Sequence, residues 1–177
     1  MRYFEKIPGE RLFLAPQNPD DAEVYAKWLN DPAVAVQLDG YSAVFNLARV
    51  QKQFEEADDA HYYAVVLREG ERLIGNVNLR DICGIGRTAT LGVFIGEAED
   101  RGKGYGAEAI RLMLGYGFDA LNLNNVALEV FADNTQGIAC YKKVGFREFG
   151  RRREATFHSG RHVDVVHMDI LAREFTP

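Results

Sequence analysis

The chain has 177 residues, of which 47% are apolar and 27% charged, a composition typical of a globular protein that buries a hydrophobic core. A formal net charge of −5 argues against a nucleic-acid partner, because such proteins use surplus lysine and arginine to neutralise phosphates. The sequence has neither a membrane-length apolar run nor a signal-peptide core, and its two cysteines make no disulfide framework, so we expect a cytoplasmic protein without a membrane partner.

The N-terminal third predicts one strand followed by two helices. Residues 11–16 form a short apolar run that ends at a proline, and residues 19–29 predict a helix with Asn18 as its N-cap. After an irregular segment at residues 33–43, residues 44–57 predict a second, amphipathic helix. Two helices joined in this way are expected to form one wall of a pocket.

A meander of strands follows the two helices. Three runs rich in β-forming residues, separated by turns, predict antiparallel strands at residues 61–67, 72–79 and 88–95. The third strand leads directly into a loop rich in glycine, and a helical pattern follows over residues 104–120.

The remaining residues predict a strand, a helix and a closing hairpin. These elements are a strand over residues 126–131, a helix over residues 134–144 that ends at Gly145, and strands over residues 147–156 and 162–171 around a turn at Ser159 and Gly160. The strand–helix–strand unit in the middle of the chain makes its two strands parallel. The element order therefore predicts a mixed α/β fold, with a sheet of six to seven strands flanked by helices, in a single domain over residues 1–177.

The glycine-rich loop predicts an anion site. Gly102, Gly104 and Gly106 let the backbone approach a ligand closely, and the first amides of the following helix have no intrahelical partners. Arg101 and Lys103 add positive charge. A P-loop is excluded because the Lys-Ser/Thr pair is absent, and the glycine spacing disfavours a dinucleotide fingerprint. An ordinary turn between a strand and a helix is the remaining alternative.

Two motifs, in this order, resemble those of the GCN5-related N-acetyltransferase (GNAT) superfamily. The segment Arg101-Gly102-Lys103-Gly104-Tyr105-Gly106 resembles its acyl-CoA-binding signature, and the segment from Asn134 to Phe146, with Tyr141, Lys143 and Gly145, is similar to its second motif. Within the family, the chain is most similar to ribosomal-protein N-terminal acetyltransferases and spermidine N-acetyltransferases. This similarity covers nearly the whole chain.

The resemblance implies the acyl-CoA N-acyltransferase fold, in which the strands at residues 88–95 and 126–131 splay apart to admit the cofactor. It implies acetyl-CoA as the cosubstrate and a primary amine as the acceptor. We expect no metal, because the histidines and cysteines form no metal-ligand pattern. The cofactor-binding residues that the resemblance implies are Val93, Phe94, Ile95, Arg101, Gly102, Lys103, Gly104, Tyr105, Gly106, Asn134, Tyr141 and Lys143. The backbone of residues 93–95 is expected to bond the pantetheine arm like an added strand, and an N–H of Val93 or Phe94 to stabilise the oxyanion.

Tyr141 is the catalytic residue that the resemblance implies. A phenol with an ordinary pKa near 10 can donate a proton to the departing CoA thiolate. The alternative is a tyrosine that only packs its helix against the sheet. Thr90 stands where many relatives carry glutamate, so the sequence identifies no general base. The candidates are Glu129, Glu97, Asp39 and His61.

The acceptor stays open between a protein N-terminal amine and a small amine of the polyamine or aminoglycoside type. Neither Cys83 nor Cys140 lies beside an evident base, so we expect direct attack in a ternary complex. A CoA-binding sensor module without turnover is the alternative from another class. A homodimer through the C-terminal hairpin is a further hypothesis. The acidic N-terminal region either attracts a cationic amine or is a solvated helix face; its residues are Asp31, Asp39, Glu55, Glu56, Asp58 and Asp59.

Overall fold

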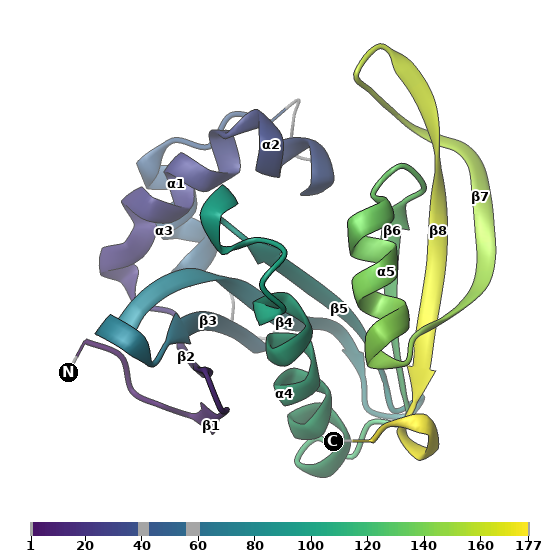
Figure 1. Cartoon of the computed structure of the whole chain (residues 1–177), viewed down its shortest axis with the longest axis horizontal. Helices are drawn as coiled ribbons and strands as arrows, with labels where there is room; N and C mark the ends of the chain where they lie inside the picture. The colour runs from purple at the N-terminus through teal and green to yellow at the C-terminus, as the bar shows by residue number, and fades with distance from the viewer. Residues whose placement is uncertain (1, 39–42, 56–60, 177) are drawn as a thin grey trace.

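The computed structural model describes residues 2–38, 43–55 and 61–176 of the chain. Within these residues, eight strands form one mixed sheet in the spatial order β1-β2-β3-β4-β5-β6-β8-β7 (Figure 1). The strands are β1 Ile7–Pro8, β2 Leu12–Pro16, β3 His61–Leu67, β4 Arg72–Cys83, β5 Thr88–Ile95, β6 Asn125–Phe131, β7 Arg147–His158 and β8 Arg161–Leu171.

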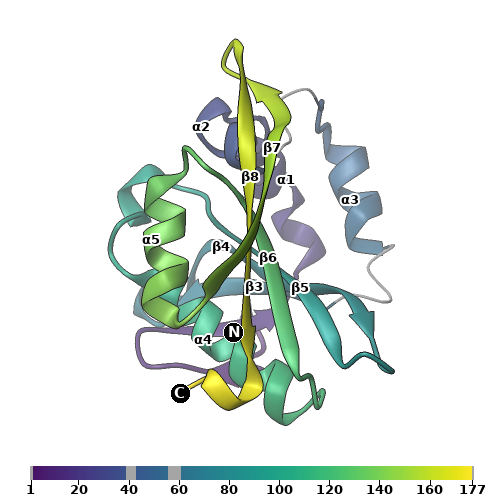
Figure 2. The ribbon, with the colours of Figure 1, turned by 90° about the vertical axis from the view of Figure 1, so that its right-hand side faces the viewer.

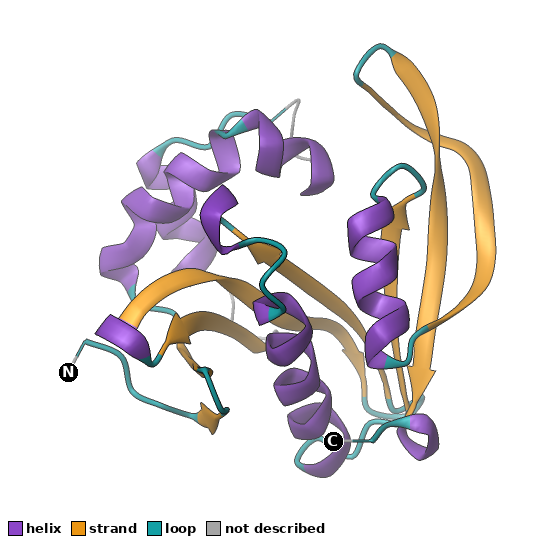
Figure 3. Cartoon of the chain, viewed as in Figure 1, coloured by secondary structure: helices purple, strands orange, loops and turns teal. Residues whose placement is uncertain are grey.

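Helices cover both faces of this sheet (Figure 3). Their bounds are α1 Ala22–Asn30, α2 Pro32–Ala35, α3 Leu47–Glu55, α4 Tyr105–Asp119 and α5 Thr135–Val144. The mixed α/β fold predicted from the element order is confirmed. The sheet has eight strands, one more than the upper limit of the predicted six to seven, because β1 has only two residues, too few to show any alternation.

The two faces of the sheet bury separate apolar clusters. Trp28 of α1 belongs to the cluster under α1 and α3, whereas Ile110 of α4 belongs to the cluster under α4 and α5. Strand β3 contributes side chains to both clusters, because Ala64 and Val66 face the first cluster and Val65 faces the second. A fully buried side chain such as Ile110 contributes roughly 2 kcal/mol by its transfer from water.

β5 and β6 diverge after a short parallel ladder. Their paired residues are Thr88 with Asn125, Ala89 with Val126, and Thr90 with Ala127. The rest of β5 stays paired with β4, and the whole of β6 stays paired with β8. The sheet therefore opens at the carboxyl ends of its two parallel strands, as the resemblance implied.

The N-terminal helical region differs in part from its prediction. The segment predicted to be irregular begins with α2 and a 3₁₀ turn at Val36–Leu38, because the Asp31 side chain accepts a bond from the Ala33 amide and starts a new helix. α3 begins only at Leu47, where Asn46 caps it through the Arg49 amide. Residues 39–42 and 56–60 lie outside the described part of the chain.

The closing hairpin confirms its predicted turn. Ser159 and Gly160 have φ angles of 52° and 77°, the left-handed pair that a two-residue hairpin loop requires. The two strands extend to residues 158 and 161, somewhat longer than predicted. Figure 2 shows this β7–β8 hairpin reaching past the rest of the sheet.

Candidate active site

The glycine-rich loop lies between β5 and α4. Gly102 and Gly104 have φ angles of 75° and 85°, a left-handed backbone that glycine adopts without the steric penalty of a Cβ atom. Gly104 is the N-cap of α4, and no described side chain caps the amides of this helix end. These amides are therefore available to an anion, at the positive end of the helix dipole.

Two arginines hold the N-terminal side of this loop, one through backbone carbonyls and the other through an ion pair. The guanidinium of Arg101 donates to the carbonyls of Ile95 and Gly96 at 3.0 and 2.5 Å. Asp100, which is 1% exposed, accepts two bonds from Arg72 at 2.6 and 2.8 Å. The Arg72 guanidinium also lowers the pKa of the Asp100 carboxyl. The loop is thus held in shape by the protein itself before any ligand arrives.

Arg11 holds the other side of the loop. It donates to the Lys103 carbonyl at 2.9 Å and to the Glu108 carboxylate at 2.8 Å, and its guanidinium lies 4.8 Å from the centre of the Tyr105 ring. The Lys103 side chain is exposed, whereas the guanidinium of Arg101 is engaged with backbone carbonyls. The sequence assigned no role to Arg11, because its partners lie 92 and 97 residues along the chain.

The backbone of β5 presents hydrogen-bonding groups where the sheet opens. The Gly96 amide donates to the Ile74 carbonyl at 2.9 Å, and such paired residues alternate along an antiparallel ladder. By this alternation, Phe94 turns its N–H and C=O toward β4, whereas Val93 and Ile95 turn theirs toward β6. Since the ladder with β6 has already ended, the backbone groups of Val93 lie at the opening.

The side chain of Phe94 forms part of the wall beside this opening. Its ring meets those of Tyr25 and Trp28 edge-on, with centroids 6.1 and 6.0 Å apart. Tyr25 in turn packs edge-on against Phe54 of α3. The aromatic cluster therefore ties the helical wall of α1 and α3 to the strand that faces the opening.

Tyr141 projects from α5 toward the same opening. Its side chain is half-buried and lines a cavity together with Val93 of β5 and Phe131 of β6. Burial raises the pKa of the phenol to about 12, so it stays protonated at neutral pH. Of the predicted second motif, Asn134 caps α5 by accepting a bond from the Gly137 amide at 2.8 Å, and the Lys143 side chain is exposed.

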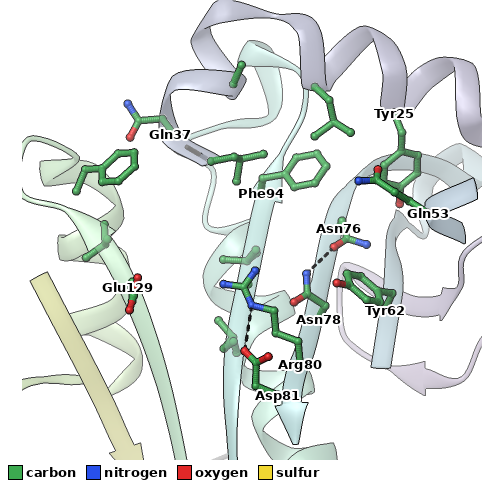
Figure 4. Close-up of a pocket in the computed structure, with 18 of the residues that line it drawn as sticks. Tyr25, Gln37, Gln53, Tyr62, Asn76, Asn78, Arg80, Asp81, Phe94 and Glu129 are labelled. Carbon is green, nitrogen blue, oxygen red and sulfur yellow. Dashed lines mark hydrogen bonds and ion pairs between the residues drawn. The ribbon is translucent and has the colours of Figure 1, made fainter. Parts of the chain in front are cut away.

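One cavity of about 1230 Å³ runs from the helical wall to the opening between β5 and β6. Figure 4 shows amide and aromatic side chains from several elements converging on it. Its described charged residues balance in number, because the lining includes the carboxylates of Asp81 and Glu129 and the guanidiniums of Arg80 and Arg152. Arg80 and Asp81 also pair with each other at 3.7 Å.

The structure shows the surroundings of three of the four candidates for a general base. Glu97 bonds Lys27 at 2.5 Å and the Trp28 indole at 3.0 Å, which lowers the pKa of its carboxyl. His61 lines the cavity but shares a hydrogen bond of 3.1 Å with Tyr116 of α4. Glu129 lines the cavity and lies 3.4 Å from His167 across the ladder. Asp39 lies outside the described residues.

Two asparagines on β4, which the sequence analysis did not single out, lie on the floor of the cavity. Asn76 is 3% exposed and Asn78 is 9% exposed. The available signal was a polar side chain at two alternate positions of the otherwise apolar stretch at residues 73–79, on either side of Val77. Such an alternation places both amides on one face of the sheet.

Among the described residues, no group of three histidine, cysteine or acidic side chains is placed to hold a metal ion. No described helix has the length and apolar character to cross a bilayer. Of the acidic N-terminal residues, Asp31 caps α2 and Glu55 is exposed at the end of α3, while residues 56, 58 and 59 lie outside the described part.

Comparisons with known proteins point to one family. The family model described as the acetyltransferase (GNAT) domain matches residues 11–147. YdaF of Bacillus subtilis, provisionally described as a ribosomal N-acetyltransferase, is 33% identical over 167 residues, which cover 94% of this chain and 79% of that one. The spermidine N(1)-acetyltransferase of Escherichia coli K12 is 28% identical over 170 residues, which cover 96% and 85% of the two chains.

Solved structures agree with the sequence comparisons. The spermidine N-acetyltransferase from Vibrio cholerae, in complex with CoA and spermine, superposes with a TM-score of 0.86 at 26% identity, covering 93% of this chain and 97% of that one. Another structure of that Vibrio enzyme is dodecameric. Both branches that the resemblance named are therefore represented among the relatives.

Proposed function

The chain belongs to the GNAT acetyltransferase family, and from this premise we propose that it transfers the acetyl group of acetyl-CoA to a primary amine by direct attack in a ternary complex. The observation that carries the proposal is the convergence of three features that the chain keeps far apart. These are the uncapped amides of the α4 N-terminus, the opening between β5 and β6, and Tyr141 on the wall of one cavity.

The cofactor's place follows from the backbone groups left without a ladder partner. The amides from Gly102 to Gly106 are suited to the pyrophosphate, with the exposed Lys103 as an outer charge. The pantetheine arm then enters between the splayed strands and bonds the backbone of Val93 and the N–H of Ile95 as an added strand would, because the Ile95 carbonyl already accepts a bond from Arg101. The ladder alternation favours the N–H of Val93, rather than that of Phe94, as the donor to the thioester oxygen.

The reaction balances with Tyr141 as the acid. The lone pair of the neutral amine forms a C–N bond with the thioester carbon, and the carbonyl electrons move to the oxygen. When the carbonyl re-forms, the C–S bond breaks and the electron pair leaves on sulfur, which takes the phenolic proton of Tyr141. The proton lost by the amine passes to solvent and restores the phenol. The products are an N-acetyl amide and CoA thiol.

The raised pKa of Tyr141 suits this role in a buried site. The burial that holds the phenol protonated also raises the pKa of a thiol in the same surroundings, as it does for the neighbouring Cys140. A thiolate leaving into this environment is therefore more basic than one in water. Because burial raises the pKa of both groups, proton transfer from the phenol to the departing sulfur stays feasible.

The cavity favours an acceptor whose amine neighbours hydrogen-bonding groups, such as a protein N-terminus. Its described charges balance, and its walls carry the amides of Gln17, Gln37 and Gln53 besides the asparagines of β4. A polyamine acceptor is the second candidate, because spermidine acetyltransferases of Escherichia coli and Vibrio cholerae are among the relatives. A cavity for a polycation is expected to hold a surplus of carboxylates.

The assignment of residues 1–177 to one N-acetyltransferase domain rests on the continuous sheet, which takes strands from Ile7 to Leu171. Self-association through the β7–β8 hairpin stays a prediction. Phe149 and Phe157 on that hairpin are 62% and 63% exposed, which supports it. Sedimentation of the intact chain tests it, since a purely monomeric species at micromolar concentration would contradict it.

Release of CoA thiol from acetyl-CoA tests the proposed function. The panel consists of a tetrapeptide amide with a free N-terminus, spermidine and an aminoglycoside. We expect thiol release that depends on the amine, with kcat/KM for the tetrapeptide at least about tenfold above that for spermidine, because one close hydrogen-bonded contact is worth this factor. Tight binding of CoA without thiol release on any amine would instead indicate a sensor module.

A further inference from the structure

A chain of side-chain amides on β4 ends in an oxygen that has no partner. The Nδ2 group of Asn76 donates to the backbone carbonyl of Tyr63 at 3.1 Å, which turns its Oδ1 toward Asn78. The Nδ2 group of Asn78 donates to that Oδ1 at 3.1 Å. Because each amide has one donor end and one acceptor end, this order leaves the Asn78 Oδ1 as the free terminus.

This oxygen is a buried hydrogen-bond acceptor that lacks a donor among the described residues. Asn78 is 9% exposed, and its Oδ1 has no hydrogen-bond partner among the described residues. A buried carbonyl oxygen without a partner is costly, so its retention calls for a functional explanation such as a bond to a ligand. Asn78 lines the cavity, and Figure 4 shows its oxygen turned away from Asn76.

The oxygen lies beside the strand that would hold the thioester. Asn78 pairs with Gly92 across the β4–β5 ladder, and a Cβ atom on Gly92 would lie 2.8 Å from the Asn78 Oδ1. A side chain at position 92 would therefore displace the Asn78 amide, whereas glycine leaves room for it. Gly92 directly precedes Val93, whose N–H is the donor suited to the thioester oxygen.

We infer that the Asn78 Oδ1 accepts a hydrogen bond from an N–H of the acceptor amine and holds its nitrogen over Gly92, facing the thioester carbon. The inference rests on the proposed function and makes Asn78 a residue that positions the acceptor. An uncharged oxygen aligns the neutral, nucleophilic amine without the pull of a carboxylate, which would favour the unreactive ammonium form. The class of acceptor is therefore an amine with at least one N–H to spare during attack.

A matched pair of substitutions tests this role. Asn78→Val and Asn78→Thr share one shape, but the threonine hydroxyl both donates toward Asn76 and accepts from an amine. We expect Asn78→Val to lower kcat/KM for the amine roughly 10- to 100-fold, with KM for acetyl-CoA unchanged. Asn78→Thr is expected to recover a clear part of this loss. The probes are the tetrapeptide amide and spermidine, each measured against the intact wild-type chain.

Several outcomes would overturn the inference. Equal losses in the two variants would assign Asn78 to packing alone, and parallel changes in KM for both substrates would indicate a general distortion. A wild-type kcat/KM in Asn78→Val would show that the Asn78 oxygen does not bond the acceptor. If either variant fails to melt cooperatively, Asn78→Leu, which keeps the shape of asparagine, replaces the pair with the same expected loss. Absence of thiol release by the wild-type chain would refute the proposed function itself.

Discussion

At the scale of single residues, the chemistry is set by burial more than by residue type. Tyr141 is half-buried among apolar neighbours, and burial raises the pKa of its phenol to about 12, which keeps it protonated as its proposed role of acid requires. The Asn78 oxygen is buried and has no partner in the part of the chain that the structure describes, which leaves it open to a donor. Glu97, by contrast, is held ionised by Lys27 and Trp28, so it is a poor base. The residue types alone did not distinguish these roles.

The raised pKa of Tyr141 predicts a loss of stability at alkaline pH. In the unfolded chain the phenol ionises with its ordinary pKa of 10.0, whereas in the folded protein burial raises the pKa to about 12. Its contribution is therefore fully present below pH 10 and is lost as the pH rises toward 12. Denaturant unfolding measured across this range should show a smaller alkaline loss for Tyr141→Phe than for wild type. Identical losses in the two proteins would refute the raised pKa.

At the scale of elements, the glycine loop is proposed to bind the cofactor through its backbone. Gly104 is at a φ of 85°, and a Cβ atom there would also lie 3.3 Å from the Arg11 guanidinium. Gly104→Ala should cost about 1–2 kcal/mol of stability and shift the amides that bind the pyrophosphate. We expect the Kd for CoA, measured by calorimetry, to rise at least about tenfold.

Gly70→Ala provides the matched control for this substitution. Gly70 has a φ of 72°, and its added Cβ would meet nothing within 4 Å. It lies in the turn between β3 and β4, away from the loop. The control should lose a similar amount of stability while the Kd for CoA stays at the wild-type value. Equal effects of the two substitutions on CoA binding would remove the loop from the cofactor site.

Elements with a local signal could be predicted from the sequence, and those that depend on distant partners could not. The turn at Ser159 and Gly160 acts within a few residues, and the structure confirms it. Asn18 is a cap as predicted, but it caps the 3₁₀ turn Pro19–Asp21 that precedes α1 rather than α1 itself. The strand β1 forms only by pairing with β2, and the role of Arg11 depends on a carbonyl of the loop far along the chain. The orphaned oxygen of Asn78 needs both Asn76 and Gly92, which only the sheet brings together.

At the scale of the whole molecule, the sheet assembles one site from four parts of the chain. The helical wall of α1 and α3 closes one side of the cavity, β4 and β5 form its floor, and α5 supplies Tyr141 across the opening. The loop proposed to bind the cofactor lies on the carboxyl side of β5, at the end where the parallel strands diverge. The arrangement separates anchoring from chemistry, so changes in the loop should alter cofactor affinity and changes at Tyr141 should alter turnover.

The most direct test of this account is the steady-state rate of Tyr141→Phe at saturating acceptor, measured as CoA thiol release over a range of acetyl-CoA concentrations. The substitution removes one oxygen and preserves the ring that packs edge-on against Phe146. The account predicts that kcat falls roughly 100-fold while KM for acetyl-CoA stays within about twofold of wild type. A wild-type kcat in the variant would contradict it and return Tyr141 to a packing role.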